Sequence, residues 1–169
     1  MSRAAAPALR PFLPADTPML AAIFAAAIEE LTGDDYNESQ QEAWAAIAVD
    51  EDAFGKKLAS ELTLIATVQS APVGFASLRG KDHIDMLYVH PGAAGQGVAS
   101  MLLDALEKLA GGRGAKSLTV DASDNAQGFF AKRGYVAKQR NSITINGEWL
   151  ANTTMQKVLA DGAAPGGPQ

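Results

Sequence analysis

The feature that most constrains this fold is a glycine-rich segment between an apolar run and an amphipathic pattern. Residues 95–100 read Gly-Gln-Gly-Val-Ala-Ser, after an apolar run at 87–91 and before a leucine-rich pattern at 102–106. This order predicts a buried strand, a tight turn and a helix that begins inside the turn. The first turn of a helix has unpaired N–H groups and a partial positive charge, and glycine lets that backbone approach an anion closely. The segment therefore predicts a site for a phosphate or a pyrophosphate.

Composition argues against several other kinds of site. The 169 residues suit one domain, which we place at 8–159, with an extension at 1–7 and a disordered tail at 160–169. The formal net charge of -5 argues against nucleic acid as a partner. The lack of cysteine and the presence of only His83 and His90 argue against a metal site. No segment has the length and apolarity of a membrane span, so we expect no membrane partner and a cytoplasmic protein.

The hydrophobic patterns along the chain predict a mixed α/β sheet. Their order is a strand, two or three helices, three strands, a helix, a strand, a helix and two strands. The predicted ranges are a strand at 8–12, a helix from 16–18 to Gly33, a helix from Ser39 through Trp44 to Val49, a helix at 52–62, strands at 64–68, 73–78 and 83–90, a helix at 97–110, a strand at 117–120, a helix at 125–132, and strands from 135 and at 149–158. Only the helix at 97–110 joins parallel strands, so we expect the first half of the sheet to be mostly antiparallel.

Two motifs in this order resemble the GCN5-related N-acetyltransferase (GNAT) family. The family's loop motif, Arg/Gln-x-x-Gly-x-Gly/Ala, is similar to Ala94-Gly95-Gln96-Gly97-Val98-Ala99. Its second motif, Asn-x-x-x-x-Phe-Tyr-x-x-x-Gly-Phe, is similar to the segment from Asn125 to Tyr135. The resemblance covers about residues 8–159, and segments 82–89 and 152–157 resemble a subgroup of acetyltransferases without assigned acceptors. It implies an α/β fold, of the α+β mixed-sheet kind, whose mostly antiparallel sheet splays between its fourth and fifth strands.

The resemblance also implies acetyl-CoA as the cofactor. Backbone N–H groups of the loop would hold the pyrophosphate. Peptide groups of Leu87 and Val89 would pair with pantetheine, and one N–H would polarise the thioester carbonyl. Asn125 is expected to contact pantetheine or only to cap its helix, and Phe130 to be core, a lid over the cofactor, or both. The implied cofactor residues are Leu87, Val89, Ala94, Gly95, Gln96, Gly97, Val98, Ala99, Ser100, Asn125 and Phe130.

Two positions depart from the family's motifs. Ala94 stands where the loop motif opens with Arg or Gln, so one polar contact is missing. Phe130 stands where a tyrosine often protonates the leaving thiolate, so this position cannot donate a proton. Tyr135 and Ser123 are the nearest remaining proton donors by sequence. The departures favour an alternative function, that of a non-catalytic acyl-CoA-binding regulatory module, and a phosphate-binding domain of unrelated function is a third alternative.

An ammonium acceptor needs a base, because only the neutral amine is a nucleophile. By strand alternation, His83 and Asp85 lie on the same face as Leu87 and Val89. The family often places its general base at one of these two positions. We therefore expect Asp85 or His83 to be the catalytic base, and favour Asp85 because it is nearer the thioester. The alternative is a local ion pair for Asp85 and a surface position for His83.

The region between the first two helices lines the acceptor pocket in the resembling family. Tyr36 and Trp44 lie there, and Asn152 on the terminal hairpin would close the other side. Each has a structural alternative: Trp44 as a core anchor, Asn152 as a backbone partner, and the acidic residues at 34–38 as a solvated charge run. The expected acceptor is a primary amine of a small molecule or peptide. Without cysteine no thioester acyl-enzyme can form, so we expect direct attack, and the family makes a homodimer one option.

Overall fold

Seven strands form one mixed sheet in the order β1-β2-β3-β4-β5-β7-β6 in the computed structural model, which describes residues 6–159. The strands are β1 (Ala8–Pro11), β2 (Leu62–Val68), β3 (Ala71–Arg79), β4 (His83–Val89), β5 (Ser117–Ser123), β6 (Val136–Ile145) and β7 (Glu148–Val158). The helices are α1 (Thr17–Leu31), α2 (Glu38–Ala45), α3 (Glu51–Ser60), α4 (Val98–Gly112) and α5 (Gln127–Ala131). Only β4 and β5 pair in parallel, which confirms the predicted mixed sheet. The predicted tail and residues 1–5 of the predicted extension lie outside the described residues.

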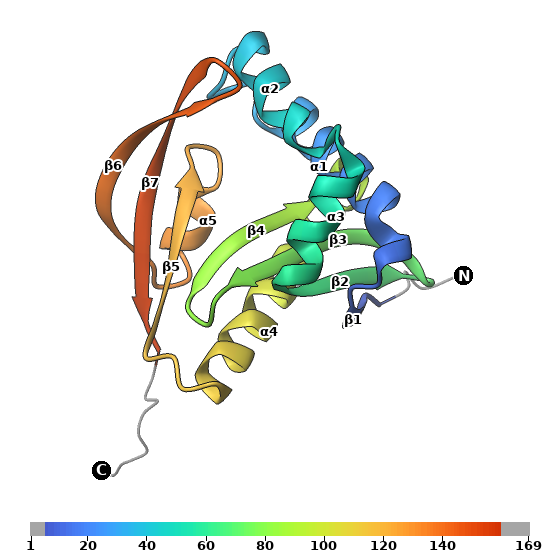
Figure 1. The fold of residues 1–169 in the computed structure, drawn as a ribbon. Helices are drawn as coiled ribbons and strands as arrows, with labels where there is room; N and C mark the ends of the chain where they lie inside the picture. The colour runs from blue at the N-terminus through green and yellow to red at the C-terminus, as the bar shows by residue number, and fades with distance from the viewer. Residues whose placement is uncertain (1–5, 160–169) are drawn as a thin grey trace.

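Helices α1 and α3 cover one face of the half-sheet β1–β4 and α4 covers the other (Figure 1). Each face has its own apolar core. On one face, α1 places residues at helical spacing against Ile65 and Phe75; these are Leu20, Ile23, Phe24 and Ile28. On the other face, α4 packs against Ala66, Ala76 and Leu78 with Leu102, Leu103, Leu106 and Ala110. Full burial of each such leucine stabilises the fold by roughly 1.5–3 kcal/mol. These cores fix β4, whose edge forms part of the site.

A β-bulge in β4 changes which side chains face which core. Leu78 pairs with Ile84 and Ser77 pairs with Met86, so Asp85 is the additional residue. Ile84 lies in the α4 core, whereas Met86 lies in the α1–α3 core. The predicted alternation is therefore wrong. Asp85 contacts α3, on the face opposite Leu87 and Val89, which pack against the α4 core.

The sheet splays between β4 and β5. The two strands pair only at His83–Thr119 and Ile84–Val120. Beyond these pairs β4 stays on β3 and β5 stays on β7, and Figure 1 shows the two strands parting toward their C-terminal ends. Residues 85–89 of β4 thus have an unpaired inner edge. The splay expected between the fourth and fifth strands is confirmed.

Several element boundaries differ from the prediction. The second helix ends at Ala45, a 3-10 turn follows at Ala46–Ala48, and Val49 is 79% exposed. The helix expected from Asn125 begins at Gln127 and has five residues. β6 is continuous over Val136–Ile145 because every residue from 139 to 145 has a cross-strand partner on β7. These differences depend on tertiary pairing, to which local patterns are blind.

Candidate active site

Two glycines shape the loop between β4 and α4. Gly95 and Gly97 have φ angles of 78° and 82°, in the left-handed region that glycine adopts at little cost. A Cβ built on either residue would meet no atom within 4 Å, so the backbone conformation rather than crowding requires glycine. Gly97 is the N-cap of α4, and the helix begins at Val98. The helix thus starts inside the glycine segment, close to the predicted start.

The backbone N–H groups of residues 95–100 have no partner in the described part of the chain. The last donation before them runs from the Ala94 N–H to Pro91 O (3.2 Å), and the first after them runs from the Met101 N–H to Gly97 O (3.1 Å). Each free N–H is a donor, and the dipole of α4 adds partial positive charge at the same place. This cluster of donors suits a phosphate group.

A cavity of about 450 Å³, here named the loop cavity, lies in front of these N–H groups. Its lining includes every predicted cofactor residue except Gln96, whose Nε2 donates to Gly92 O at 3.4 Å. The lining residues are Leu31, Leu87, Val89, Ala93, Ala94, Gly95, Gly97, Val98, Ala99, Ser100, Asn125, Ala126, Phe129, Phe130 and Arg133. The two motifs, which are separated in sequence by α4 and β5, therefore meet around one cavity.

Arg133 lines the loop cavity and was not predicted from the sequence. Its guanidinium donates to the Ser100 hydroxyl and to Phe129 O (3.0 Å), and its Cζ lies 3.9 Å from the centroid of the Phe129 ring. Stacking over an aromatic ring fixes the plane of a guanidinium. In the sequence, only its charge and its place two residues before Tyr135 point to Arg133 as a site residue. Neither feature shows that its side chain reaches α4.

A second cavity of about 140 Å³, the splay cavity, lies where β4 and β5 part. Its polar and aromatic lining includes Thr32, Trp44, Asp85, Tyr88, Asp121, Ser123 and Asn125. It shares Leu31, Leu87, Val89, Asn125, Ala126 and Phe130 with the loop cavity. The two cavities therefore adjoin at the unpaired edge of β4, and Asp85 is the predicted base that lines the splay cavity.

Asp85 belongs to a charged cluster between α3 and the sheet. Lys57 Nζ lies 2.8 Å from Asp85 Oδ2 and 3.5 Å from Glu61 Oε2. Arg79 Nη1 lies 3.3 Å from Asp85 Oδ1. The local ion pair considered for Asp85 is therefore present, and Asp85 also reaches the splay cavity.

The cluster moves the two carboxyl pKa values in opposite directions. Burial alone would raise the pKa of Asp85, but the Lys57 ammonium, the Glu61 carboxyl and Arg79 together outweigh it, so this pKa lies below its usual range. Burial raises the pKa of Glu61, and the neighbouring Asp85 raises it further. Asp85 is thus ionised across the neutral range, whereas Glu61 keeps its proton to a higher pH than an exposed glutamate.

His83 lies at the paired end of β4 and lines neither cavity. Its Nδ1 is 2.8 Å from Thr119 Oγ1, and its Nε2 is 3.8 Å from Asp121 Oδ2. Burial lowers the pKa of His83, and Arg79 lowers it further, so the imidazole is neutral at pH 7. Of the two predicted bases, the structure brings only Asp85 to the splay cavity.

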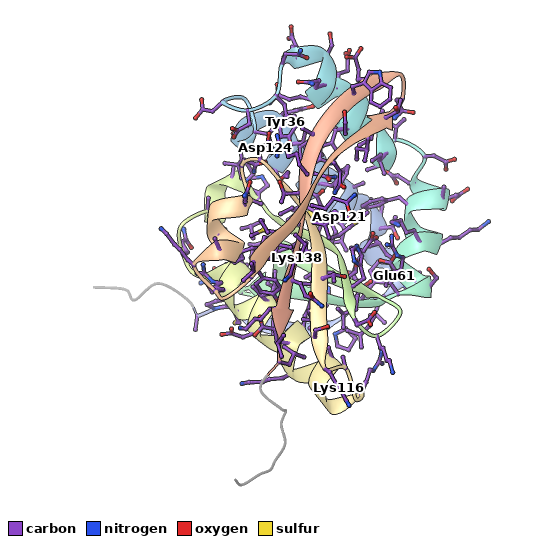
Figure 2. The ribbon with its side chains drawn as sticks, turned by 90° about the vertical axis from the view of Figure 1, so that its left-hand side faces the viewer. Tyr36, Glu61, Lys116, Asp121, Asp124 and Lys138 are labelled. Atoms are coloured by element: carbon purple, nitrogen blue, oxygen red, sulfur yellow. The ribbon has the colours of Figure 1, made fainter. Side chains whose placement is uncertain are left out.

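The predicted acceptor residues lie in different places. Trp44 lines the splay cavity and packs edge-on against Tyr88 and Tyr36, with ring centroids 6.4 and 5.3 Å away. Tyr36 and Asn152 line neither cavity. The Tyr36 hydroxyl donates to Ala151 O (2.6 Å) and accepts from the Asp124 N–H (2.9 Å), beside which it lies in Figure 2. Asn152 Oδ1 accepts from Asn141 Nδ2 at 2.9 Å. Contact of Tyr36 or Asn152 with an acceptor stays a prediction.

The two proton donors suggested by sequence differ in their surroundings. The Tyr135 hydroxyl donates to Glu107 Oε2 (2.8 Å), away from both cavities, and burial followed by Glu107 raises its pKa strongly. Ser123 lines the splay cavity and donates to Asn125 Oδ1 at 2.7 Å.

Asn125 is not the N-cap of α5; that residue is Ala126. Phe130 is both core and lining, since it is 3% exposed and borders both cavities.

Two other kinds of site are not seen among residues 6–159. No three or more His, Asp or Glu side chains of this part gather where they could hold a metal ion. None of its helices has the length and apolarity that a bilayer span requires. The two adjoining cavities are therefore the site from which function is argued.

Known proteins with the same pattern support one family. The model of the acetyltransferase (GNAT) domain matches residues 32–159. The uncharacterized N-acetyltransferase YafP of Escherichia coli K12 is 36% identical over 148 residues, which are 88% of this chain and 93% of YafP. A crystal structure from Rhodopseudomonas palustris, described as a GCN5-related N-acetyltransferase and as an aminotransferase of class II, is 67% identical with a TM-score of 0.91, over 94% of this chain and 99% of that one. The PaiA N-acetyltransferase of Thermoplasma acidophilum, in complex with coenzyme A, shares the fold at 18% identity, with a TM-score of 0.74 over 90% of this chain and 99% of that one. The chain therefore belongs to the GCN5-related N-acetyltransferase (GNAT) family and is an acetyltransferase.

Proposed function

We propose that this acetyltransferase moves the acetyl group of acetyl-CoA to a primary amine of a small molecule or peptide by direct attack. The observation that carries the proposal is the junction of the two cavities at the unpaired edge of β4. The two cavities share Leu87 and Val89, which belong to this edge. The donor and the acceptor would therefore meet beside Leu87 and Val89.

The loop cavity suits the CoA part of the donor. The free N–H groups of residues 95–100 would hold the pyrophosphate, and PaiA, a protein with this fold, binds coenzyme A. The inner edge of β4 at Leu87 and Val89 would pair with the pantetheine amides as an added strand would. One N–H of this edge would donate to the thioester carbonyl oxygen, where negative charge develops during attack.

The splay cavity suits an amine that is cationic in solution. Asp85 and Asp121 supply negative charge, and Trp44 and Tyr88 supply aromatic faces that attract an ammonium. Its volume of about 140 Å³ favours an unbranched alkylammonium over a bulky aminoglycoside. We propose that Asp85 takes the ammonium proton, through a water molecule, before the attack.

The transfer then balances in one step. The amine nitrogen forms a bond to the acetyl carbon while the C–S bond breaks, and the electron pair leaves with the sulfur. The second nitrogen proton, lost once the N–C bond has formed, goes to solvent, because Asp85 already holds the ammonium proton. The thiolate takes a proton from solvent, or from the Ser123 hydroxyl, which solvent then reprotonates, since Phe130 has none to give. Proximity and the β4 backbone donors would provide most of the acceleration.

A free-thiol release assay with acetyl-CoA tests this function on a panel of alkylamines, amino acids, antibiotics and lysine peptides. We expect turnover with at least one alkylammonium acceptor.

Phe130 is the observation that favours the second candidate, a non-catalytic acyl-CoA-binding module. Binding of CoA without turnover over the whole panel would support that module instead. If CoA does not shift the melting temperature, neither function holds.

Asp85→Asn is expected to lower kcat/KM at pH 7 by roughly a hundredfold, the order of magnitude of a general base. Because the pKa of Asp85 lies below its usual range, the wild-type base is ionised throughout pH 6–9. The variant should depend on the neutral fraction of the acceptor and rise more steeply with pH. His83→Gln is the matched control, because His83 lines neither cavity, and its profile should follow the wild type. An unchanged profile in Asp85→Asn would remove Asp85 from the mechanism.

A cytoplasmic location and a homodimer stay predictions. Light scattering of the purified chain, with and without CoA, measures the oligomeric state. Fractionation of the host cell measures the location.

A further inference from the structure

The N-terminal end of α4 has more positive charge than the protein around it balances. The free N–H groups of residues 95–100 and the helix dipole add partial positive charge there. The Arg133 guanidinium lies at the same turn, bonded to the Ser100 hydroxyl. Within residues 6–159 no carboxylate lies within 4 Å of this guanidinium. An anion at this turn would relieve the imbalance.

Arg133 is held with spare donors. Its hydrogen bonds to the Ser100 hydroxyl and to Phe129 O use two of the five N–H donors that a guanidinium has. The Phe129 ring, 3.9 Å from Cζ, holds the guanidinium plane at the wall of the loop cavity. A planar, oriented guanidinium with free N–H groups suits bidentate recognition of a phosphate.

The loop itself lacks the side chain that its motif usually supplies. Ala94 lines the loop cavity with a methyl group where the resembling loops have Arg or Gln. Arg133 enters the same cavity from the segment that joins α5 to β6. It therefore brings the missing kind of donor from another part of the chain.

We propose that Arg133 is a ligand of the CoA pyrophosphate and replaces the polar side chain absent at position 94. The inference rests on the proposed function for the identity of the anion. Ser100 is the third residue of α4, so its hydroxyl lies in the same first helical turn as the free N–H groups. This placement assigns Arg133 to the pyrophosphate rather than to the 3′-phosphate. Ser100 would then exchange the guanidinium for the phosphate as the ligand binds.

Calorimetric titration with CoA, dephospho-CoA and pantetheine tests the assignment without any turnover. Arg133→Gln should weaken the binding of CoA and of dephospho-CoA by the same factor, about ten- to a hundredfold, as expected for the loss of a charge-assisted hydrogen bond. Pantetheine, which has no phosphate, should bind both proteins alike. Lys132→Gln is the matched control, because it removes the same charge one residue away and outside the loop cavity, and should leave all three affinities within twofold.

Each other outcome overturns the inference. A loss for CoA alone would assign Arg133 to the 3′-phosphate, and equal affinities in Arg133→Gln and wild type would remove it from the site. A merely structural role would weaken pantetheine as well and would leave the salt dependence of CoA binding unchanged. We expect instead a smaller salt slope in Arg133→Gln and partial recovery of affinity in Ala94→Arg/Arg133→Gln. A wild type that binds CoA separates failure of this inference from failure of the proposed function.

Discussion

The backbone conformation at Gly97 is one that glycine adopts at lower free energy than any other residue type. Its φ of 82° turns the chain from the loop into α4 and aims the free N–H groups at the loop cavity. A residue with a Cβ in this conformation loses roughly 1–2 kcal/mol. Gly112, at the other end of the same helix, has no positive φ and has the same open space around it. A comparison of substitutions at these two glycines therefore distinguishes the effect of backbone conformation from the effect of crowding.

Gly97→Ala is expected to lower the free energy of unfolding by about 1 kcal/mol, because alanine is strained at this φ. It should also weaken CoA binding, because the N–H groups would no longer point into the loop cavity. Gly112→Ala should have no effect or stabilise the protein by a few tenths of a kcal/mol, since alanine is the better helix former. Urea unfolding and CoA titration measure both. Equal effects of the two substitutions would contradict the conformational argument.

Asp85 and Glu61 show how elements combine at the site. The bulge in β4 turns Asp85 toward α3, where Lys57 stabilises its charge, and Glu61 follows the last turn of α3. In Figure 2, Glu61 lies well apart from Tyr36. One end of the cluster is therefore the splay cavity and the other is the end of α3. Protonation of Glu61 therefore removes a charge at the end of α3.

The stability of this helix end is expected to depend on pH. Because the pKa of Glu61 is raised in the folded protein, its contribution to stability is complete below the unfolded pKa of about 4.3 and is lost as pH rises through the folded pKa. Glu61→Gln has no such loss. Its melting temperature should match the wild type near pH 4 and exceed it at pH 8, in thermal scans from pH 4 to 8. A variant that melts below the wild type at pH 8 would refute the buried-charge explanation.

The segment between α1 and α2 is connected to the second half-sheet through Tyr36. Its hydroxyl bonds Ala151 of β7 and the Asp124 N–H after β5, and the residue is 5% exposed. Tyr36→Phe removes the hydrogen-bond partner of a partly buried carbonyl and of a partly buried N–H, so we expect a loss of about 1–3 kcal/mol of unfolding free energy. Trp149→Phe, at a 64% exposed position, should change it by less than about 0.5 kcal/mol. Denaturant unfolding that shows equal values for the two variants would rule out this connection.

On the scale of the whole molecule, the site is the boundary between two half-sheets. β4 belongs to the first half, β5 to the second, and two residue pairs join them. A ligand along the unpaired edge of β4 would add hydrogen bonds to both the strand and the loop. CoA binding should therefore reduce local opening at the boundary between the half-sheets and leave local opening inside each half-sheet unchanged.

Hydrogen exchange with and without CoA tests this division. We expect slower exchange when CoA is bound at residues 95–100 and at those N–H groups of residues 85–89 that face the unpaired edge of β4, because these groups gain acceptors. The amides of α3, which lies away from both cavities, should exchange at an unchanged rate. Protection spread evenly over both half-sheets would mean that CoA binds elsewhere or acts through global stabilisation.

The sequence by itself determined the family, the order of elements and the glycine loop, because glycine spacing and apolar periodicity are local properties of the chain. The tertiary structure decided which charged side chains meet at the site. The bulge reversed the predicted face of Asp85, since one additional residue in β4 shifts an alternation of two. Arg133 and Ser100 are 33 residues apart, and Tyr36 and Ala151 are 115 apart. Contacts at such separations depend on how the half-sheets pack, and a local pattern does not encode that packing.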